Sequence, residues 1–333
     1  MRTRSIDGRD VGAIGLGCMG MSWAYGEPDD ASSLAVLARS LELGVDHWDT
    51  ADLYGAGANE TLLAKALPGV RDRVFLATKF GNVFDRSLTS HQDQVRANAG
   101  WIVDGTPEYA RKSIDASLQR LGVDSVDLYY LHRVDDQVPI EETVGAMAES
   151  VKAGKARAIG LSECSAETLR RAHAVHPIAA VQSELSVWTR DYLSDVVPLC
   201  AELGTAFVAY SPLGRGFLTG RFDSPEDFPE GDYRRNSPRF QGENFARNKA
   251  IVDAVREIAD AHGARPGQVA LAWVLAQGPH VVTIPGTKRV PYLEENAAAD
   301  DLILTPDEIA RLSDLPATAG GRYAEAMAHT VNR

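Results

Sequence analysis

The sequence predicts an α/β fold in which eight parallel strands, each followed by a helix, close into a (β/α)8 TIM barrel with an N-terminal β-hairpin and long loops at its carboxyl face. Short apolar runs rich in β-forming residues alternate with stretches of helical periodicity along the chain. Such alternation requires parallel strands with right-handed crossovers, and eight units close into a barrel more readily than they extend as an open sheet. Because no Pro/Ser-rich linker divides the chain, we expect one domain over residues 1–333.

The predicted strands begin after a short hairpin. Two brief runs flank Asp7-Gly8, a dipeptide that favours the positive φ values of a type I′ turn. The apolar runs that follow predict strands at 11–19, 45–51, 74–80, 124–132, 156–163, 179–186, 206–213 and 281–287.

A helical pattern follows each predicted strand. Several patterns end in a glycine that is suited to the left-handed residue after a last helical turn, namely Gly44, Gly122, Gly154 and Gly204. The patterns cover 32–44, 59–67, 107–122, 139–154, 165–175, 192–204 and 291–299, with one further helix after an insertion behind the seventh strand. Two long polar loops, 81–106 and 213–242, stand out, and loops of this length are usually lids or binding loops.

Composition and charge narrow the classes of partner. With 44% hydrophobic and 24% charged residues the chain has ample apolar material for a core. A net charge of -12 disfavours nucleic acid and anionic membranes as partners. Cys18, Cys164 and Cys200 are too scattered for a disulfide framework or a CxxC site, and neither a leader nor a membrane span is recognisable. We therefore expect a cytoplasmic protein; its oligomeric state is not readable from the sequence.

Polar residues stand where the predicted strands end. In a (β/α)8 barrel these ends form one mouth, where catalytic groups lie. Taken singly, such an Asp is more often a helix cap, a Lys a solvated residue and a His a structural one. Together, however, Asp49, Tyr54, Lys79 and His132 supply an acid, a phenol, a cation and an imidazole at three consecutive strand ends, which indicates a proton-transfer site.

The segments at these strand ends also match a known family. They are GVDHWDTADLYG, VFLATKF, VDLYYLHRVD, AIGLSE, VQSELS, AYSPLGRGFLTG and IPGTKRVPYLEEN. They resemble the successive motifs of the aldo-keto reductases, over about Gly15 to Asn296. The phrases GCMGMS, HRVD and GGRYAEAM are most similar to the bacterial and plant NADPH-dependent reductases with long barrel loops.

The resemblance implies an NADP-dependent, alcohol dehydrogenase-type oxidoreductase that reduces aldehydes or ketones to alcohols by hydride transfer. Its catalytic tetrad would be Asp49, Tyr54, Lys79 and His132, with Tyr54 as the general acid. A free phenol has a pKa of about 10, so a cation must stabilise the phenolate at neutral pH. That is the expected role of Lys79, itself held by Asp49, while His132 would orient the carbonyl oxygen.

The resemblance also implies the residues that bind NADPH. Ser162 and Gln182 would bond the nicotinamide carboxamide, and Tyr210 would stack on the ring. The pyrophosphate would meet Ser211, Leu213, Arg215 and Gly216; the 2′-phosphate would meet Thr287, Lys288 and Arg289, with Gly286 beside them in the cofactor site; and the adenine would meet Glu295 and Asn296. Two adjacent cations favour NADP over NAD, and without GxGxxG spacing around Gly15 a Rossmann domain is not expected.

Two positions depart from the family, and two other readings stay open. Glu163 stands where many relatives have Asn, and Tyr292 where many have Arg or Gln. An NADPH-binding regulatory or sensor subunit with weak turnover is an alternative; a metal-dependent barrel enzyme would need His/Asp ligand clusters, which we do not find, so no metal is expected. The substrate would be a small carbonyl compound of unidentified structure, with candidate pocket walls at Trp23, Tyr25, Phe84, Trp101 and Trp188.

Overall fold

The computed structural model describes residues 1–23, 25, 27–84, 101–230, 232–323 and 331; the side chains of Phe84 and Trp101 lie outside this description. A single sheet of eight parallel strands forms the barrel, in the order β12-β11-β10-β9-β8-β5-β4-β3. Parallel bridges that join Ile14 to Thr283 and Gly17 to Gly286 bring its two edges together. The predicted (β/α)8 barrel is thereby confirmed.

The barrel strands are shorter than the predicted apolar runs. They are β3 (Leu16–Gly17), β4 (His47–Asp49), β5 (Phe75–Phe80), β8 (Val126–Leu131), β9 (Ala156–Ser162), β10 (Ala180–Glu184), β11 (Ala206–Tyr210) and β12 (Val281–Thr283). The first predicted strand, 11–19, is divided, because its beginning pairs in the N-terminal hairpin and only Leu16–Gly17 joins the barrel.

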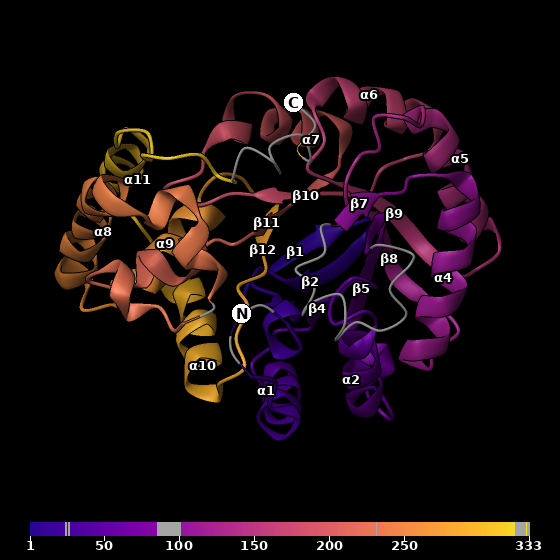
Figure 1. Ribbon diagram of the computed structural model, residues 1–333, viewed down its shortest axis with the longest axis horizontal. Coiled ribbons are helices and arrows are strands. Elements are labelled where there is room, and N and C mark those ends of the chain that lie inside the picture. Colours follow the sequence, from indigo (N-terminus) through magenta and orange to yellow (C-terminus); the bar gives the residue numbers. More distant parts are fainter. Residues whose placement is uncertain (24, 26, 85–100, 231, 324–330, 332–333) are drawn as a thin grey trace.

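Helices surround the strands (Figure 1). They are α1 (Asp30–Glu42), α2 (Ala58–Ala66), α4 (Pro107–Leu121), α5 (Ile140–Lys152), α6 (Ala166–Val175), α7 (Val196–Leu203), α8 (Gly242–His262), α9 (Pro266–Leu275), α10 (Val290–Ala298) and α11 (Pro306–Ser313). Side-chain caps start several of them, as where Thr106 accepts from the Tyr109 amide ahead of α4. The seventh unit differs from the prediction, because two helices, α8 and α9, follow its strand.

The N-terminal hairpin closes the bottom of the barrel. β1 (Thr3–Ile6) and β2 (Arg9–Gly12) are antiparallel, and Asp7 and Gly8 have φ values of 51° and 75°, as expected for a type I′ turn. Ile6 and Val11 pack into the cluster of buried side chains that fills the barrel interior. The far end of the barrel is therefore left as the mouth.

The two long loops carry short elements of their own. Within 81–106, β6 (Asn82–Phe84) pairs with β7 (Trp101–Val103) in antiparallel fashion. Within 213–242 lie the 3-10 turns η4 (Gly214–Thr219), η5 (Pro225–Asp227), η6 (Tyr233–Asn236) and η7 (Pro238–Phe240). The remaining 3-10 turns are η1 (Met19–Met21), η2 (Arg71–Arg73), η3 (Asp191–Ser194) and η8 (Ala299–Asp301).

Alternation along each strand decides which side chains face the barrel interior. Phe75 and Ala77 of β5 belong to the interior cluster, whereas Leu76 and Phe80 belong to the larger cluster between strands and helices. Side chains two residues apart share a face, so Lys79 points inward at the last inward position of its strand. The same alternation turns Asp49, His132 and Gln182 toward the mouth.

Candidate active site

Lys79 lies at the centre of the buried polar site at the barrel mouth. Its side chain is 0% exposed, and its Nζ donates to the carboxylate of Asp49 and to the carbonyl of Thr50 at 2.9 Å. A third donor contact reaches the Tyr54 hydroxyl at 3.5 Å. The strands β4 and β5 pair directly, so the sheet register itself brings Asp49 and Lys79 together.

Gln182 and His132 complete the inner ring of the site. Gln182 donates through Nε2 to the second carboxylate oxygen of Asp49, at 2.8 Å. The His132 ring lies edge-on to the Tyr54 ring, with centroids 5.7 Å apart and planes at 84°. The predicted tetrad therefore lies together with Gln182, which the resemblance assigned to the cofactor. The tetrad consists of Asp49, Tyr54, Lys79 and His132.

Tyr54 reaches the site from a loop that the neighbouring elements hold. Asn59, at the start of α2, donates to the carbonyl of Cys18 at 2.9 Å and accepts from Thr50 at 2.6 Å. The turn between Tyr54 and Asn59 contains Gly57, whose φ of 90° would be strained in a residue with a side chain. The Trp23 ring stacks on Tyr54 at 6.4 Å, so the phenol is covered from the side of η1.

Burial and charge set the protonation states of these groups. Burial raises the pKa of Tyr54, and the Lys79 ammonium offsets only part of that effect. For Lys79 burial acts to lower the pKa, but Asp49 and Tyr54 outweigh it and the pKa is raised. Burial, together with the charges of Lys79 and Arg133, lowers the pKa of His132 well below its ordinary value. At neutral pH the site therefore holds a neutral phenol, a cationic lysine and a neutral imidazole.

A second group of buried charges adjoins this ring, and we call it the ion cluster: Arg133, Glu163, Glu184, Arg215, Arg239 and Arg322. Arg322 bonds to both carboxylates, reaching Glu184 at 3.1 Å through Nε. Arg239 and Arg215 reach Glu184 at 3.3 and 3.4 Å. Such groups would each cost several kcal/mol to bury alone, so their mutual pairing is required.

The guanidinium groups keep both carboxylates ionised. Burial would raise the pKa of Glu184, but Arg322, Arg215 and Arg239 lower it to about 2. Burial acts in the same way on Glu163, and Arg322 and Arg133 again bring its pKa below the ordinary value. Three donors of the cluster, Arg133 Nε, Arg239 Nε and Arg322 Nη1, have no acceptor among the described residues. Buried donors normally have a partner, so these three call for an acceptor that the described residues do not supply.

Tyr210 stands between the ion cluster and the mouth. It is the last residue of β11 and is half-buried. Its hydroxyl accepts from Arg322 at 2.6 Å and lies 3.0 Å from the hydroxyl of Tyr323. Ser162, at the end of β9, accepts from Arg133 at 3.4 Å. The side chains expected around a nicotinamide ring are therefore close to one another, and Ser162 and Tyr210 are tied to the ion cluster.

The segment after β11 follows the rim of the mouth in a strained backbone. Ser211 and Arg215 have positive φ values of 49° and 58°. Arg215 lies over the rings of Tyr233 and Tyr323, at 5.3 and 5.4 Å from their centroids. The same segment contains Leu213 and Gly216. It therefore places the Arg215 guanidinium and a stretch of main chain along one edge of the mouth.

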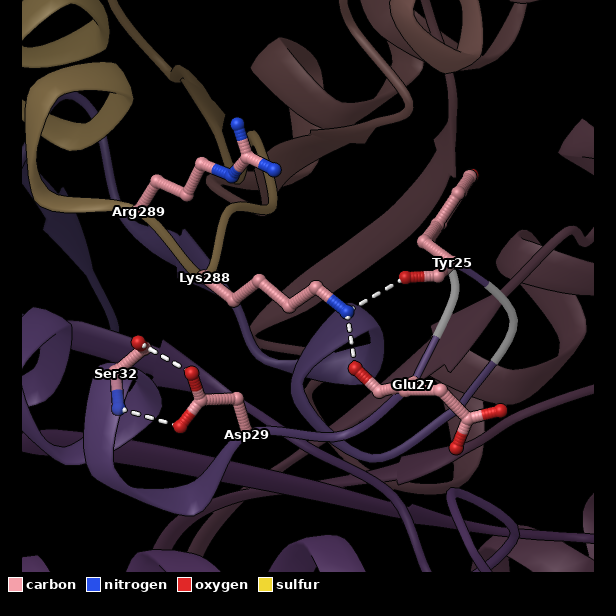
Figure 2. A pocket seen from close by; sticks show the side chains of 6 residues that line it. All are labelled: Tyr25, Glu27, Asp29, Ser32, Lys288 and Arg289. Atoms are coloured by element: carbon pink, nitrogen blue, oxygen red, sulfur yellow. Dashed lines mark hydrogen bonds between the residues drawn. The ribbon is translucent and has the colours of Figure 1, made fainter. Parts of the chain in front are cut away.

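Lys288 and Arg289 line a pocket of ≈ 380 Å³ together with Tyr25, Glu27, Asp29 and Ser32 (Figure 2). Lys288 Nζ donates to the carbonyls of Tyr25 and Glu27, at 2.7 and 2.6 Å. Asp29 caps α1 and accepts from Ser32, so its carboxylate is already engaged. The pocket thus joins the start of α1 to the start of α10, with two cations beside it.

The remaining predicted cofactor residues lie close in sequence to this pocket. Gly286 and Thr287 precede Lys288 directly, and Thr287 accepts from the Arg289 amide at 3.1 Å. Asn296 is buried on α10, and the Glu295 carbonyl accepts from Gln268 at 3.2 Å. Tyr292, which departs from the family pattern, has two guanidinium groups near its ring: that of Arg221 at 4.9 Å and that of Arg289 at 5.7 Å from the ring centroid.

The candidate pocket walls fall into three groups. Trp23 and Tyr25 are half-buried at the mouth, and the Tyr25 hydroxyl bonds to that of Tyr233 at 2.7 Å. Trp188 is instead buried in the core, where its ring stacks on that of Phe217 with centroids 5.0 Å apart, so it packs there and does not line a pocket at the mouth. The side chains of Phe84 and Trp101 lie outside the described residues.

The ion cluster as a unit was not predicted from the sequence, although Arg215 was assigned to the pyrophosphate and Glu163 was named as a departure from the family. Arg133 and Arg322 lie within HRVD and GGRYAEAM, two phrases that carried the resemblance, and Glu184 lies within the predicted strand 179–186. Their pairing depends on contacts between segments up to 159 residues apart, which no local pattern reveals. Over the described part of the chain we find neither a group of three potential metal ligands nor a helix long and apolar enough to cross a membrane.

Comparison with known proteins shows the family of this chain. The sequence model of the aldo/keto reductase family matches residues 13–316. The NADP(+) aldo-keto reductase yakc of Schizosaccharomyces pombe is 45% identical over 329 residues, which cover 96% of this chain and 94% of that protein. A probable aldo-keto reductase of Glycine max is 43% identical over 327 residues, or 97% of this chain and 91% of its own length.

Solved structures agree on the fold. The glycerol dehydrogenase of Gluconobacter oxydans superposes with a TM-score of 0.85 at 29% identity, covering 99% of this chain and 96% of its own. An aldo/keto reductase from Klebsiella pneumoniae, solved in complex with NADP and acetate, has a TM-score of 0.70 at 26% identity and covers 96% and 97% of the two chains.

Proposed function

Because this chain belongs to the aldo/keto reductase family, whose members are oxidoreductases, we propose that it is an NADPH-dependent enzyme that reduces aldehydes or ketones to alcohols, with Tyr54 as the general acid. The contact of Lys79 with both Asp49 and Tyr54 carries this proposal. A buried phenol beside a buried cation can give up its proton when negative charge develops on a nearby oxygen.

Each side chain of the site would have its own role in the reduction. When bound, NADPH supplies a hydride to the carbonyl carbon, so the carbonyl oxygen must receive a proton. Tyr54 is protonated at neutral pH and donates it, and Lys79 stabilises the phenolate that remains. Neutral His132 hydrogen-bonds the carbonyl oxygen and directs it toward Tyr54. Asp49 keeps Lys79 in place.

The residues present fit NADP. Lys288 and Arg289 offer two cations for a 2′-phosphate beside the ≈ 380 Å³ pocket, and Gly286 and Thr287 would help to cradle it. Arg215 and the backbone of Ser211, Leu213 and Gly216 would hold the pyrophosphate. Glu295 and Asn296 would meet the adenine, and Tyr210, Ser162 and Gln182 the nicotinamide. The unsatisfied donors of the ion cluster support a polar ligand at that end.

Gln182 would serve two partners. Its Nε2 already bonds to Asp49, which leaves its amide oxygen for the carboxamide nitrogen. We also propose that residues 1–333 form one domain, since Arg2 bonds to Asp300 at 2.8 Å and Arg322 to Glu184, so contacts tie both the N-terminal residues and Arg322 to the rest of the fold.

Titration of the purified protein with NADPH and NADH, followed by absorbance decay with a panel of aromatic and aliphatic carbonyl compounds, tests the proposal. We expect tight NADPH binding and turnover of at least one carbonyl class. Tight binding without any turnover would instead favour the regulatory or sensor alternative. Absence of NADPH binding would contradict the cofactor assignment.

A further inference from the structure

Arg322 enters the barrel mouth from the segment that follows α11. It is only 7% exposed, although it lies beyond the last helix of the chain. Its guanidinium makes bonds to three side chains that belong to three different strand ends or the loops beyond them: Glu163, Glu184 and Tyr210. This residue therefore connects the C-terminal segment to the face on which a nicotinamide ring would lie.

Most partners of Arg322 have other bonds. Glu163 also accepts from the Tyr192 hydroxyl at 2.8 Å and from the Glu184 amide at 2.9 Å. Glu184 also accepts from Thr189 at 2.7 Å and pairs with Arg239 and Arg215. The Tyr210 hydroxyl, by contrast, bonds only to Arg322 and Tyr323 among the described residues. The hydroxyl of Tyr210 thus depends on the C-terminal segment alone.

Tyr323 reinforces the same contact from the other side. Its hydroxyl lies 3.0 Å from that of Tyr210 and accepts from Arg133 at 3.2 Å. Two consecutive residues of the segment therefore hold one phenol, and they link it to Arg133, which directly follows His132. A ring whose hydroxyl is fixed at two points cannot rotate or tilt freely about its χ angles.

We propose that Arg322 is a positioning residue for the nicotinamide end of the cofactor: it fixes the Tyr210 ring through its hydroxyl and neutralises the carboxylate of Glu163. This inference rests on the proposed function, namely on NADPH lying with its nicotinamide against Tyr210. The stacking of two flat rings requires a defined plane and offset, so a loosened Tyr210 weakens it. Pairing with Arg322 also explains how this chain accommodates Glu163 where many relatives have Asn.

Binding of two ligands separates this role from general support of the fold. NADPH contains the nicotinamide, whereas adenosine 2′,5′-bisphosphate contains only the adenosine and the 2′-phosphate. In Arg322→Lys, which keeps the charge but loses the planar fork, we expect the Kd of NADPH measured by calorimetry to rise about tenfold. The Kd of the bisphosphate should stay within about twofold. The control variant Arg111→Lys, in an exposed pair with Glu149, should change neither.

Tyr210→Phe provides an independent test, because it keeps the ring and the ion pairs and removes only the hydroxyl. We expect the same selective loss of NADPH affinity, and this variant decides the matter if Arg322→Lys does not fold. Unchanged NADPH affinity in Tyr210→Phe, or equal loss of both ligands in Arg322→Lys, would overturn the inference. If the unmodified protein does not bind NADPH, the proposed function fails instead, so the two failures are distinguishable.

Discussion

The floor of the barrel mouth is built from strand residues, whereas its rim is built from loops and the C-terminal segment. The floor consists of Asp49, Lys79, His132 and Gln182, which the alternation of β4, β5, β8 and β10 turns inward. The rim joins segments that are distant in the chain, as where Tyr25 bonds to Tyr233, 208 residues away. Strand register places the floor before any ligand arrives, while the rim depends on contacts among side chains.

Because the two regions are built differently, the chemical step and the binding of the cofactor should be separable by mutation. Substitutions at Tyr54, or in the floor that supports it, should remove the proton donor or its cation and so lower the rate of reduction. Substitutions in the rim should change the affinity for the cofactor and leave the chemical step in place. Variants of the floor should therefore affect the rate most strongly, and variants of the rim and of buried groups outside the mouth should have weaker effects.

Lys79→Met is expected to have the largest effect, because Tyr54 loses its cation and Asp49 is left buried without its partner. We expect kcat at saturating NADPH to fall by about a thousandfold and the free energy of unfolding to fall by about 3–5 kcal/mol. Steady-state kinetics and chemical denaturation measure the two effects. Lys65→Met, in an exposed pair with Asp30, serves as the control.

The double variant Asp49→Asn/Lys79→Met separates the two losses. Removal of both charges should restore much of the stability, since no unpaired buried charge remains. The rate should stay low because the phenol still lacks its cation. Recovery of the rate in the double variant would contradict the role of Lys79.

Glu184→Gln should destabilise the ion cluster in a manner that depends on pH. The folded-state pKa of about 2 lies below the ordinary 4.5, so ionised Glu184 stabilises the fold above pH 4.5, and this stability is lost as the pH falls through 2. We expect Gln at this position to cost about 3 kcal/mol at pH 7. The difference between the two proteins in urea denaturation should shrink steadily below pH 4.5. A difference that is constant down to pH 3 would contradict the pKa assignment.

Lys288→Ala with Arg289→Ala tests the rim. Loss of two cations beside the pocket should weaken NADPH binding about thirtyfold and NADH binding about threefold or less, as measured by fluorescence titration. kcat at saturating NADPH should be nearly unchanged, because the floor is intact. Equal loss of affinity for both cofactors would remove the 2′-phosphate from this pocket.

Asp52→Asn should have the smallest effect, with the opposite sign. Burial, together with the nearby Glu60, raises the pKa of Asp52 to about 7, and its Oδ1 has no partner among the described residues. A raised pKa means that the ionised carboxyl destabilises the fold as the pH rises from about 4 to about 7. The variant should therefore be more stable than the parent by about 1 kcal/mol at pH 8. Thermal denaturation at pH 5 and pH 8 should show a clearly larger gain at the higher value.

The sequence was sufficient for the fold and for the floor. The apolar runs that alternate with helical stretches located the strands. Because strand ends in a parallel barrel share one mouth, Asp49, Lys79 and His132 could be expected to meet. The bounds were less accurate: the run 11–19 contributes to both the hairpin and the barrel, and the seventh unit contains α8 and α9. Apolar runs do not reveal which of their residues find a pairing partner.

The contacts that hold the rim and the ion cluster together could not be predicted, because their energies come from pairing between distant segments. Nothing local distinguishes Arg322, which is buried against Glu184 138 residues away, from an arginine in solvent. Trp188 is the opposite case. It follows a strand and was a candidate pocket wall, but it packs on Phe217 in the core. Side chains in loops are placed by tertiary contacts, which periodicity does not report.

The most direct test of the central claim is the single-turnover rate of NADPH oxidation by Tyr54→Phe at a saturating carbonyl concentration, with the Kd of NADPH measured on the same sample. If Tyr54 donates the proton, the rate should fall by about a thousandfold while the Kd stays within about twofold. A rate within about tenfold of the parent, or a loss of NADPH affinity as large as the loss of rate, would contradict that role.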